Sequence, residues 1–323
     1  MSRFKVFVIA LVLISIKSFA CLNGESKYLK NGYIAYIDFR GLVPHGHHFS
    51  NFKSPKILVE LDSLYRKTND IEYLSDKGYV LIIQKKYQEA LQLYLNIEKI
   101  KPNRYSTASN IGTLYELMGE NQKAYNWIKK SIEINPESHN GSEWLHLKIL
   151  EAKIKKLNTV TSSFLINTDF GSIGGPQTNL SKEEVDKLAH EIYFQVNERM
   201  SFIKPKDKII SILLFELGNL AELKGESENA LRIYKSALTY GYEGDLIVPR
   251  MINSAIGKSR EYEKKSRELS LALEKNKNRT ALDYVNRIER SLIILSVFST
   301  ILLISFIVFF YKWKKLKNTT STS

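Results

Sequence analysis

The chain has 323 residues, with 47 Lys or Arg against 34 Asp or Glu, so its net charge at pH 7 is +13. A basic excess of this size is typical of nucleic-acid-binding proteins. However, residues 1–20 and 312–323 carry seven of these charges, residues 258–290 carry four, and residues 21–257 carry only two. The body therefore gives no indication of nucleic-acid binding. A single Cys also excludes an intramolecular disulfide framework and a Cys-rich zinc module.

Residues 1–20 have the pattern of an export signal. Two basic residues precede the apolar run 6–16, and a small-x-small cleavage site ends at Ala20. Eleven apolar residues reach roughly 16 Å as a helix, which is too short for a bilayer core of about 30 Å. Two alternatives stay open, because Lys17 near the cut is also compatible with an uncleaved anchor and Cys21 with a lipid-modified mature N-terminus.

Residues 291–311 form the expected membrane-spanning helix. They contain no charged residue over 21 positions, which matches the roughly 20 residues that a spanning helix needs. Four lysines follow at once in the tail 312–323, whereas the preceding flank carries charges of both signs. By the positive-inside rule the tail is cytoplasmic. We therefore expect a single-pass protein of the cytoplasmic (inner) membrane, with its body outside, in the periplasm.

The body contains a repeat with a period of 34 residues, at about 71–104, 105–138 and 211–244. A Gly, an Ala and a final Pro recur in register, although the third copy lacks the Pro. These residues are Gly78, Ala90 and Pro102, then Gly112, Ala124 and Pro136, then Gly218 and Ala230. We expect the Gly where two helices cross, the Ala as the facing small residue, and the Pro at the end of the second helix.

This pattern resembles the tetratricopeptide repeat, a helix–turn–helix unit of 34 residues. The resemblance implies an all-α fold, a TPR-like α-solenoid whose concave face is lined by the first helix of each unit. The whole arrangement also resembles the membrane-anchored tetratricopeptide proteins of Bacteroidetes-type bacteria. It implies no particular biochemical activity.

Other segments surround the repeats within a helical domain at 53–257. Residues 21–52 are expected to form a small extended segment, with a hairpin at Asn31-Gly32. Residues 158–180 are rich in turn-forming residues and are expected to be an insertion loop. Residues 258–290 are expected to form a charged juxtamembrane helix, either single and solvated or paired in a coiled-coil dimer.

The leading hypothesis is a non-enzymatic scaffold or adaptor that binds a protein or peptide partner without a cofactor. No arrangement of nucleophile and base is recognisable, so catalysis is not expected. No oligomeric state is predicted. The repeat register places candidate partner-binding residues on the concave face, namely Tyr79, Ser109, Thr113, Glu116, Phe215 and Asn219.

An alternative hypothesis is a protein that binds a metal or an envelope polymer through His45, His47 and His48. Histidine is a common metal ligand, but no Asp, Glu or Cys completes a tetrahedral set within this motif. Three solvated loop histidines are the competing interpretation. Glu143 and His146 have the i, i+3 spacing of carboxylate-bridged metal sites. No matching motif exists on a second helix, so a structural role is expected for this pair.

Overall fold

The computed structural model describes residues 26–38, 42–52, 54–157, 159–275 and 287–303, with some side chains in these ranges not described. The chain divides into two compact units after Lys258. The expected export signal 1–20, Cys21 and the expected tail 312–323 lie outside the described residues.

The first unit begins with a two-stranded antiparallel sheet. Strand β1 (Ser26–Tyr28) pairs with β2 (Ile34–Ile37), with Ser26 opposite Ile37. Gly32 lies in the turn at φ +88°, a conformation that favours glycine. The extended N-terminal segment therefore contains the predicted hairpin.

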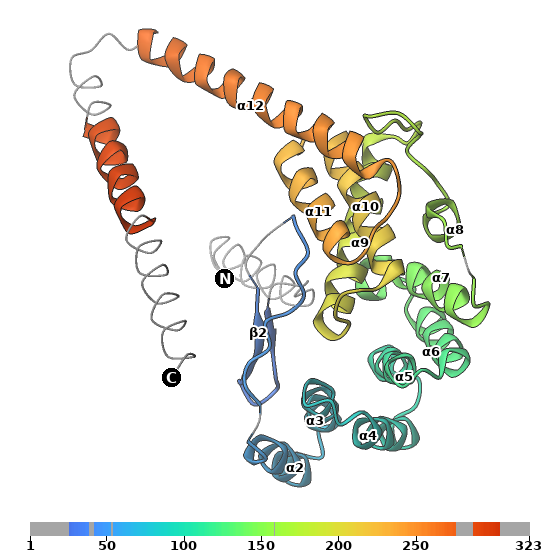
Figure 1. The fold of residues 1–323 in the computed structure, drawn as a ribbon. Coiled ribbons are helices and arrows are strands. Elements are labelled where there is room, and N and C mark those ends of the chain that lie inside the picture. Colours follow the sequence, from blue (N-terminus) through green and yellow to red (C-terminus); the bar gives the residue numbers. More distant parts are fainter. Residues whose placement is uncertain (1–25, 39–41, 53, 158, 276–286, 304–323) are drawn as a thin grey trace, which may run out of the picture. The chain divides into compact units, whose positions relative to one another are not determined.

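The rest of the first unit is helical, and its helices stack in pairs as an α-solenoid (Figure 1). Helices α3 and α4, α5 and α6, and α10 and α11 occupy the three predicted repeats. The helices are α2 (Lys56–Thr68), α3 (Ile71–Ile83), α4 (Tyr87–Ile100), α5 (Tyr105–Leu117), α6 (Asn121–Ile134), the short 3₁₀ helix η2 (Ser138–Gly141), α7 (Glu143–Ile154), α8 (Ser162–Ile166), α9 (Lys182–Phe202), α10 (Lys208–Leu223), α11 (Ser227–Thr239) and α12 (Ile247–Lys275).

In each repeat the two helices cross closely at a glycine. An added Cβ there would lie 2.4–2.6 Å from a side chain sixteen positions later, at Gly78 against Tyr94, at Gly112 against Ile128 and at Gly218 against Tyr234. No real Cβ could occupy that space without displacing its neighbour. The predicted crossing position is thus occupied by glycine for a steric reason, and the nearest facing side chain is Tyr or Ile rather than the expected Ala.

The alanines and prolines of the repeat have related roles. Ala90, Ala124 and Ala230 are fully buried in the second helix of each unit. Pro102 and Pro136 each stand two residues beyond the end of such a helix, as expected for a residue that cannot continue one.

Residues 158–180 differ from the expected loop because part of them enters the core. They include the short helix α8, and Leu165, Ile166 and Phe170 are buried. The fully buried Arg250 of α12 donates from Nη2 to the carbonyl oxygens of Phe170 and Gly171, at 2.8 and 2.7 Å. The apolar residues of this segment therefore cover the third repeat, and only its Gly-rich part is a surface loop.

Helix α12 begins within the body, eleven residues before the expected juxtamembrane helix at 258. Its first turns are part of the core, since Arg250 and Ser254 are fully buried. Beyond Lys258, in the second unit, its described side chains are mostly exposed and form i, i+4 ion pairs such as Lys265 with Glu261.

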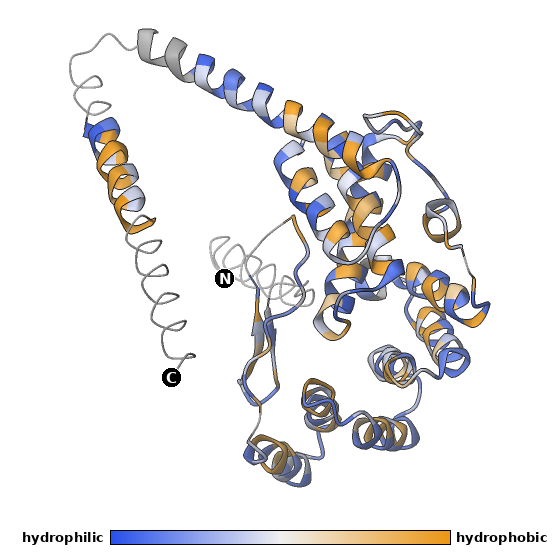
Figure 2. Cartoon of the chain, in the orientation of Figure 1, coloured by the Kyte–Doolittle hydropathy of each residue, from blue (hydrophilic) through white to orange (hydrophobic). Residues whose placement is uncertain are grey.

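The second unit also contains a helix over residues 287–303, which Figure 2 colours largely as hydrophobic. Its large apolar side chains are exposed. In the described part of the chain, no helix combines the length and the apolarity that crossing a membrane requires. Residues 304–311 of the expected spanning segment lie outside that part.

Candidate functional site: a polar hollow on the concave face

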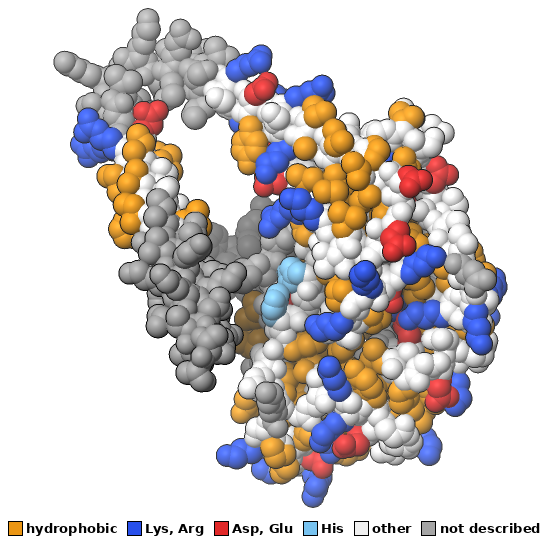
Figure 3. Space-filling view, in the orientation of Figure 1, with side chains coloured by type: hydrophobic (Ala, Val, Ile, Leu, Met, Phe, Trp, Pro, Cys, Tyr) orange, Lys and Arg blue, Asp and Glu red, His pale blue; other side chains and the backbone are white. Residues whose placement is uncertain are grey.

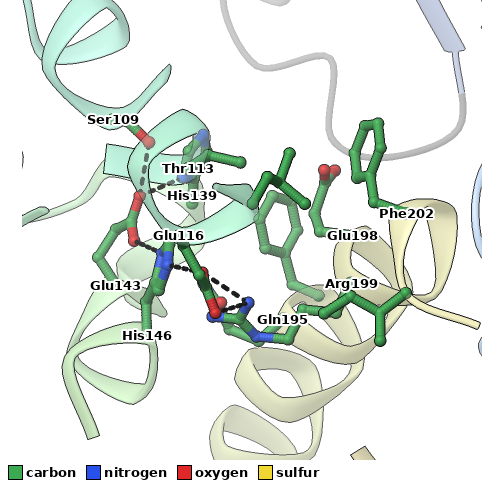
Figure 4. Close-up of a pocket in the computed structure, with 13 residues that line it drawn as sticks. Ser109, Thr113, Glu116, His139, Glu143, His146, Gln195, Glu198, Arg199 and Phe202 are labelled. Carbon is green, nitrogen blue, oxygen red and sulfur yellow. Dashed lines mark hydrogen bonds and ion pairs between the residues drawn. The ribbon is translucent and has the colours of Figure 1, made fainter. Parts of the chain in front are cut away.

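The concave face of the second repeat borders a small cavity of about 60 Å³, here called the hollow (Figure 4). It lies between α5, the η2–α7 segment and α9. The lining residues are Ser109, Thr113, Glu116 and Leu117, then His139, Glu143 and His146, then Phe194, Gln195, Glu198, Arg199, Phe202 and Ile203.

Helical spacing explains why these side chains converge. Ser109, Thr113 and Glu116 are related by i, i+4 and i+7, so they lie on one face of α5. On α9, Gln195 and Phe202 are likewise seven residues apart, with Glu198 and Arg199 between them. Two polar faces from distant parts of the sequence thus meet at the hollow.

Glu116 is the most heavily paired group of the hollow. Its carboxylate accepts hydrogen bonds from Arg199 Nη1 at 3.0 Å, His146 Nε2 at 2.7 Å and Lys153 Nζ at 2.7 Å. Burial alone would raise the pKa of Glu116, but the charges of these three partners outweigh burial and hold that pKa well below its usual value. Glu116 therefore remains ionised and ties α5 to α7 and α9.

Glu143 is the second buried carboxylate. It accepts from the Ser109 hydroxyl at 2.9 Å, and His139 Nδ1 and His146 Nδ1 lie 2.5 and 3.0 Å from its oxygens. Burial opposes its ionisation, yet His139 and His146 lower the pKa of Glu143. Conversely, burial would lower the pKa of His139, but Glu143 raises it. His139 and Glu143 thus stabilise each other as an ion pair.

Two charged side chains of the hollow remain open to solvent. The side chains of Glu198 and His139 are 38% and 39% exposed, whereas those of Glu116 and Glu143 are 4% and 1% exposed. The ring of Phe194 stacks on His139 with centroids 5.3 Å apart. The hollow can therefore offer a carboxylate acceptor and an imidazole donor beside apolar walls. Within the described residues, no group of three or more His, Cys, Asp or Glu side chains is placed to hold a metal ion.

The structure brings three of the six predicted partner-binding residues together, because Ser109, Thr113 and Glu116 all line the hollow. Tyr79 lies elsewhere on the concave face and is half-buried beneath the N-terminal segment. Lys27 Nζ lies 4.7 Å from the centroid of the Tyr79 ring, and the Phe49 ring meets it edge-on.

Phe215 and Asn219 do not lie on an open surface as expected. Phe215 is buried and stacks on Tyr242 with ring centroids 4.3 Å apart. Asn219 is 1% exposed, accepts from the Tyr234 hydroxyl at 2.8 Å and donates to Glu216. The repeat register predicts which face they occupy, but not that other segments cover this face. Partner binding by any of the six residues stays a prediction.

The three histidines of the N-terminal loop have different environments, contrary to the expectation of three solvated side chains. His45 and His48 are exposed, the His48 side chain to 76%, whereas His47 is buried between Asp38 and Glu198. Both ring nitrogens of His47 face carboxylates. The metal-binding alternative gains no support from this arrangement.

Sequence reasoning missed the contribution of α9. Its capping box, Ser181 with Glu184, predicts where the helix starts and is present in the structure. Phe194, Glu198 and Phe202 follow at intervals of four, which places them on one face of this helix. No sequence pattern, however, indicates that this face meets α5, because Arg199 is 83 residues from its partner Glu116.

Comparison with known proteins supports the repeat assignment. The family model described as tetratricopeptide repeat matches residues 106–138, the second repeat. No curated protein matches the chain.

Among solved structures, the chain is similar to a double mutant titled MamA RS-1 ArsTM, with 14% identity and a TM-score of 0.32 over 58% of this chain and 84% of that one. It is also similar to a tetratricopeptide repeat protein from Parabacteroides merdae ATCC 43184, with 17% identity and a TM-score of 0.26 over 61% and 91%. The matched second repeat and the same glycine crossing in three helix pairs show that the chain contains repeats of the tetratricopeptide type.

Proposed function

We propose that the chain is a non-enzymatic scaffold that binds a protein or peptide partner at the hollow. The observation that carries this proposal is the solvent-open pair of Glu198 and His139, set beside Phe194 in an otherwise buried and neutralised network. Solenoids of this kind generally use their concave surface for binding.

The surrounding ion pairs supply the rigidity that such a site needs. Glu143 orients His139, and the pairing of Glu116 with Arg199 fixes the segment of α9 that carries Glu198. Side chains held in this way lose little conformational entropy when a partner binds. A partner segment with a hydrogen-bond donor for Glu198 and an acceptor for His139 would fit this arrangement.

The proposal also places the scaffold outside the cytoplasmic membrane, anchored by one C-terminal helix with a cytoplasmic tail. Support comes from the sequence: an uncharged segment at 291–311, four lysines directly after it, and a signal-like N-terminus. Anchoring would restrict the partner to proteins or peptides of the cell envelope.

A site-specific crosslinking experiment tests both parts. In a Cys21→Ser background, Thr113→Cys places a thiol in the hollow and Lys129→Cys places one on the exposed surface of α6. A membrane-impermeant maleimide with a photoreactive group is added to intact spheroplasts. We expect both thiols to react, and a discrete crosslinked partner to form from position 113 at least about tenfold more than from position 129.

Two outcomes would overturn the proposal separately. Absence of labelling at position 129 until the membrane is permeabilised would contradict the external location. Labelling at both positions, with no crosslinked species or with equal species from both, would contradict partner binding at the hollow.

A further inference from the structure

The N-terminal loop lies directly on α9 through backbone contacts. The Asn197 side-chain oxygen accepts from the amides of His45 and Gly46, at 3.0 and 2.9 Å. The amide of His47 donates to the Ser201 hydroxyl at 2.8 Å. A Cβ at Gly46 would lie 2.8 Å from the backbone of Met200, and Gly46 has a φ of +78°. Residues 45–47 of the segment 42–52, here called the strap, therefore fit α9 closely, whereas Ser50 and Phe52 bond to Ala35 of β2 and to Gln84.

The side chain of His47 joins the strap to Asp38, directly after β2, and to Glu198 of α9. It is 1% exposed, with Nδ1 2.5 Å from Asp38 Oδ2 and Nε2 2.6 Å from Glu198 Oε1. An ionised carboxylate only accepts hydrogen bonds, and a neutral imidazole has a single N–H to donate. Two such contacts at once therefore require the imidazolium form.

Besides the two carboxylates, the groups around His47 come from several elements. Tyr36 of β2 stacks on the ring at 3.9 Å, and its pKa is raised, chiefly by burial, so it stays neutral. Tyr79 of α3 is neutral for the same reason. The other charged or titratable groups nearby are Lys27 of β1 and His139 of η2, which act on Glu198, and the neighbours His45 and His48 on the strap.

Burial lowers the pKa of His47, but the hydrogen bonds and charges of Glu198 and Asp38 outweigh burial and raise it. The same pairing lowers the pKa of Glu198 against the effect of its burial.

The strap also borders the hollow. His47 holds the carboxylate of Glu198, which lines the hollow, and the ring of Phe49 lies 5.4 Å from that of Phe202, another lining residue. Figure 4 shows Glu198 and Phe202 close together on α9. A loosened strap would free the one carboxylate that the hollow presents to solvent.

We propose that the strap is a pH-sensitive clamp on α9 at the edge of the hollow, which charged His47 fastens to α9 and which loosens when His47 loses its proton. The contribution of His47 to docking is fully present below pH 6.5, the ordinary value for histidine, and is lost as the pH rises through the higher value of the docked state. The docking does not depend on any partner; only its effect on partner access rests on the proposed function.

Hydrogen exchange on the purified full chain in detergent tests the docking without a partner. After correction for intrinsic exchange, we expect protection of the amides of residues 45–47 to be constant below pH 6.5 and to fall at least about tenfold at higher pH. Amides of α4 serve as the internal reference. His47→Gln has a single, uncharged donor nitrogen in place of the two ring nitrogens and should give low protection of the strap at every pH. His48→Gln, at an exposed position, should leave the natural profile unchanged.

Two results would overturn the inference: a flat profile in the natural chain, or an unchanged pH-dependent profile in His47→Gln. Loss of α4 protection in His47→Gln would signal global unfolding. In that case Asp38→Asn, which keeps one carboxylate partner, replaces it and should lower the pH of the transition. Because exchange is measured without a partner, its outcome is independent of the crosslinking result.

Discussion

The second and third repeats have the same crossing of two helices at a glycine. On their concave sides, however, the buried carboxyl groups have pKa values shifted in opposite directions. Gly112 and Gly218 bring the helices together in the same way. Beside the second repeat, Glu116 is an ion with three cationic or imidazole partners. Beside the third, Glu216 is buried among neutral donors, and burial raises its pKa more than Ser162, Asn219 and Arg250 lower it.

The covering segments cause this difference. Helices α7 and α9 present Lys153 and Arg199 to the second repeat. The third repeat is covered by α8. The nearby Arg250 donates to the carbonyl oxygens of Phe170 and Gly171 and not to Glu216. In Figure 2, α10 is accordingly apolar over much of its surface. The repeat pattern determines how the two helices of each unit pack. The segments that cover the concave face then determine whether that face is a polar site or part of the core.

Figure 3 shows a related contrast at the surface. On the face in view, Lys and Arg are scattered over the body, and hydrophobic side chains gather near the first turns of α12. Val248, Ile252 and Ile256 of that helix are exposed. The Lys and Arg side chains that Figure 3 colours thus do not form a single patch on this face.

The largest expected effect comes from removing the charge that holds the second repeat to α9. Glu116→Gln leaves Arg199 buried without its carboxylate, which we expect to cost about 3–5 kcal/mol of unfolding free energy. Urea denaturation of the purified chain, followed by helical circular dichroism, measures the loss.

The pH dependence provides a second readout for the same variant. Because the pKa of Glu116 is lower in the folded chain, its contribution is present above its ordinary value of 4.5 and is lost as the pH falls toward the folded value. The natural chain should therefore approach Glu116→Gln in stability on acidification. Glu133→Gln, at an exposed position on α6, is the matched control and should change stability by less than about 0.5 kcal/mol. A Glu116→Gln chain as stable as this control at pH 7 would refute the ionic role.

The shared helix crossing is tested by adding a methyl group at the crossing glycines. Gly218→Ala would place its Cβ 2.4 Å from the ring of Tyr234, whose hydroxyl is held by Asn219. Gly112→Ala meets the flexible end of Ile128 instead. We expect a cost of about 2–3 kcal/mol for Gly218→Ala and about 1–2 kcal/mol for Gly112→Ala, by thermal or urea unfolding.

Gly174→Ala is the control for these variants. Its nearest neighbour would be 4.0 Å away, so a stability change of less than about 0.5 kcal/mol is expected. Equal losses at Gly174 and Gly218 would show that the cost arises from the glycine itself rather than from the crossing.

The sequence predicts the paired helices of the repeats well, because the contacts within each pair join residues that are close in the sequence. The 34-residue register predicts the crossing positions Gly78, Gly112 and Gly218, and each of these contacts a residue only sixteen positions later in the sequence. The same register predicts which face of α5 is concave, and this is why Ser109, Thr113 and Glu116 prove to share a site.

The rest depends on contacts between distant segments that leave no periodic signal. His47 meets Glu198 across 151 residues. The covering of Phe215 and Asn219 likewise depends on how the segment 158–180 packs, and its Gly-rich composition predicts a loop although its apolar residues enter the core. The α5 side of the candidate site was therefore predictable, and its partners on α9 were not.

The smallest expected effect would sharpen the contrast between the two carboxylates. Glu216→Gln replaces a carboxyl group whose pKa is raised by burial with a neutral isostere of its protonated form, so we expect a change of less than about 1 kcal/mol below the ordinary value of 4.5. A carboxyl group whose pKa is raised on folding stabilises the folded chain below its ordinary value of 4.5 and loses that contribution as the pH rises. Glu216→Gln should thus gain stability relative to the natural chain between pH 5 and pH 8, in the direction opposite to Glu116→Gln on acidification. If urea unfolding across this range gave a constant difference, Glu216 would be ionised like Glu116, and the two concave faces would differ in shape but not in charge.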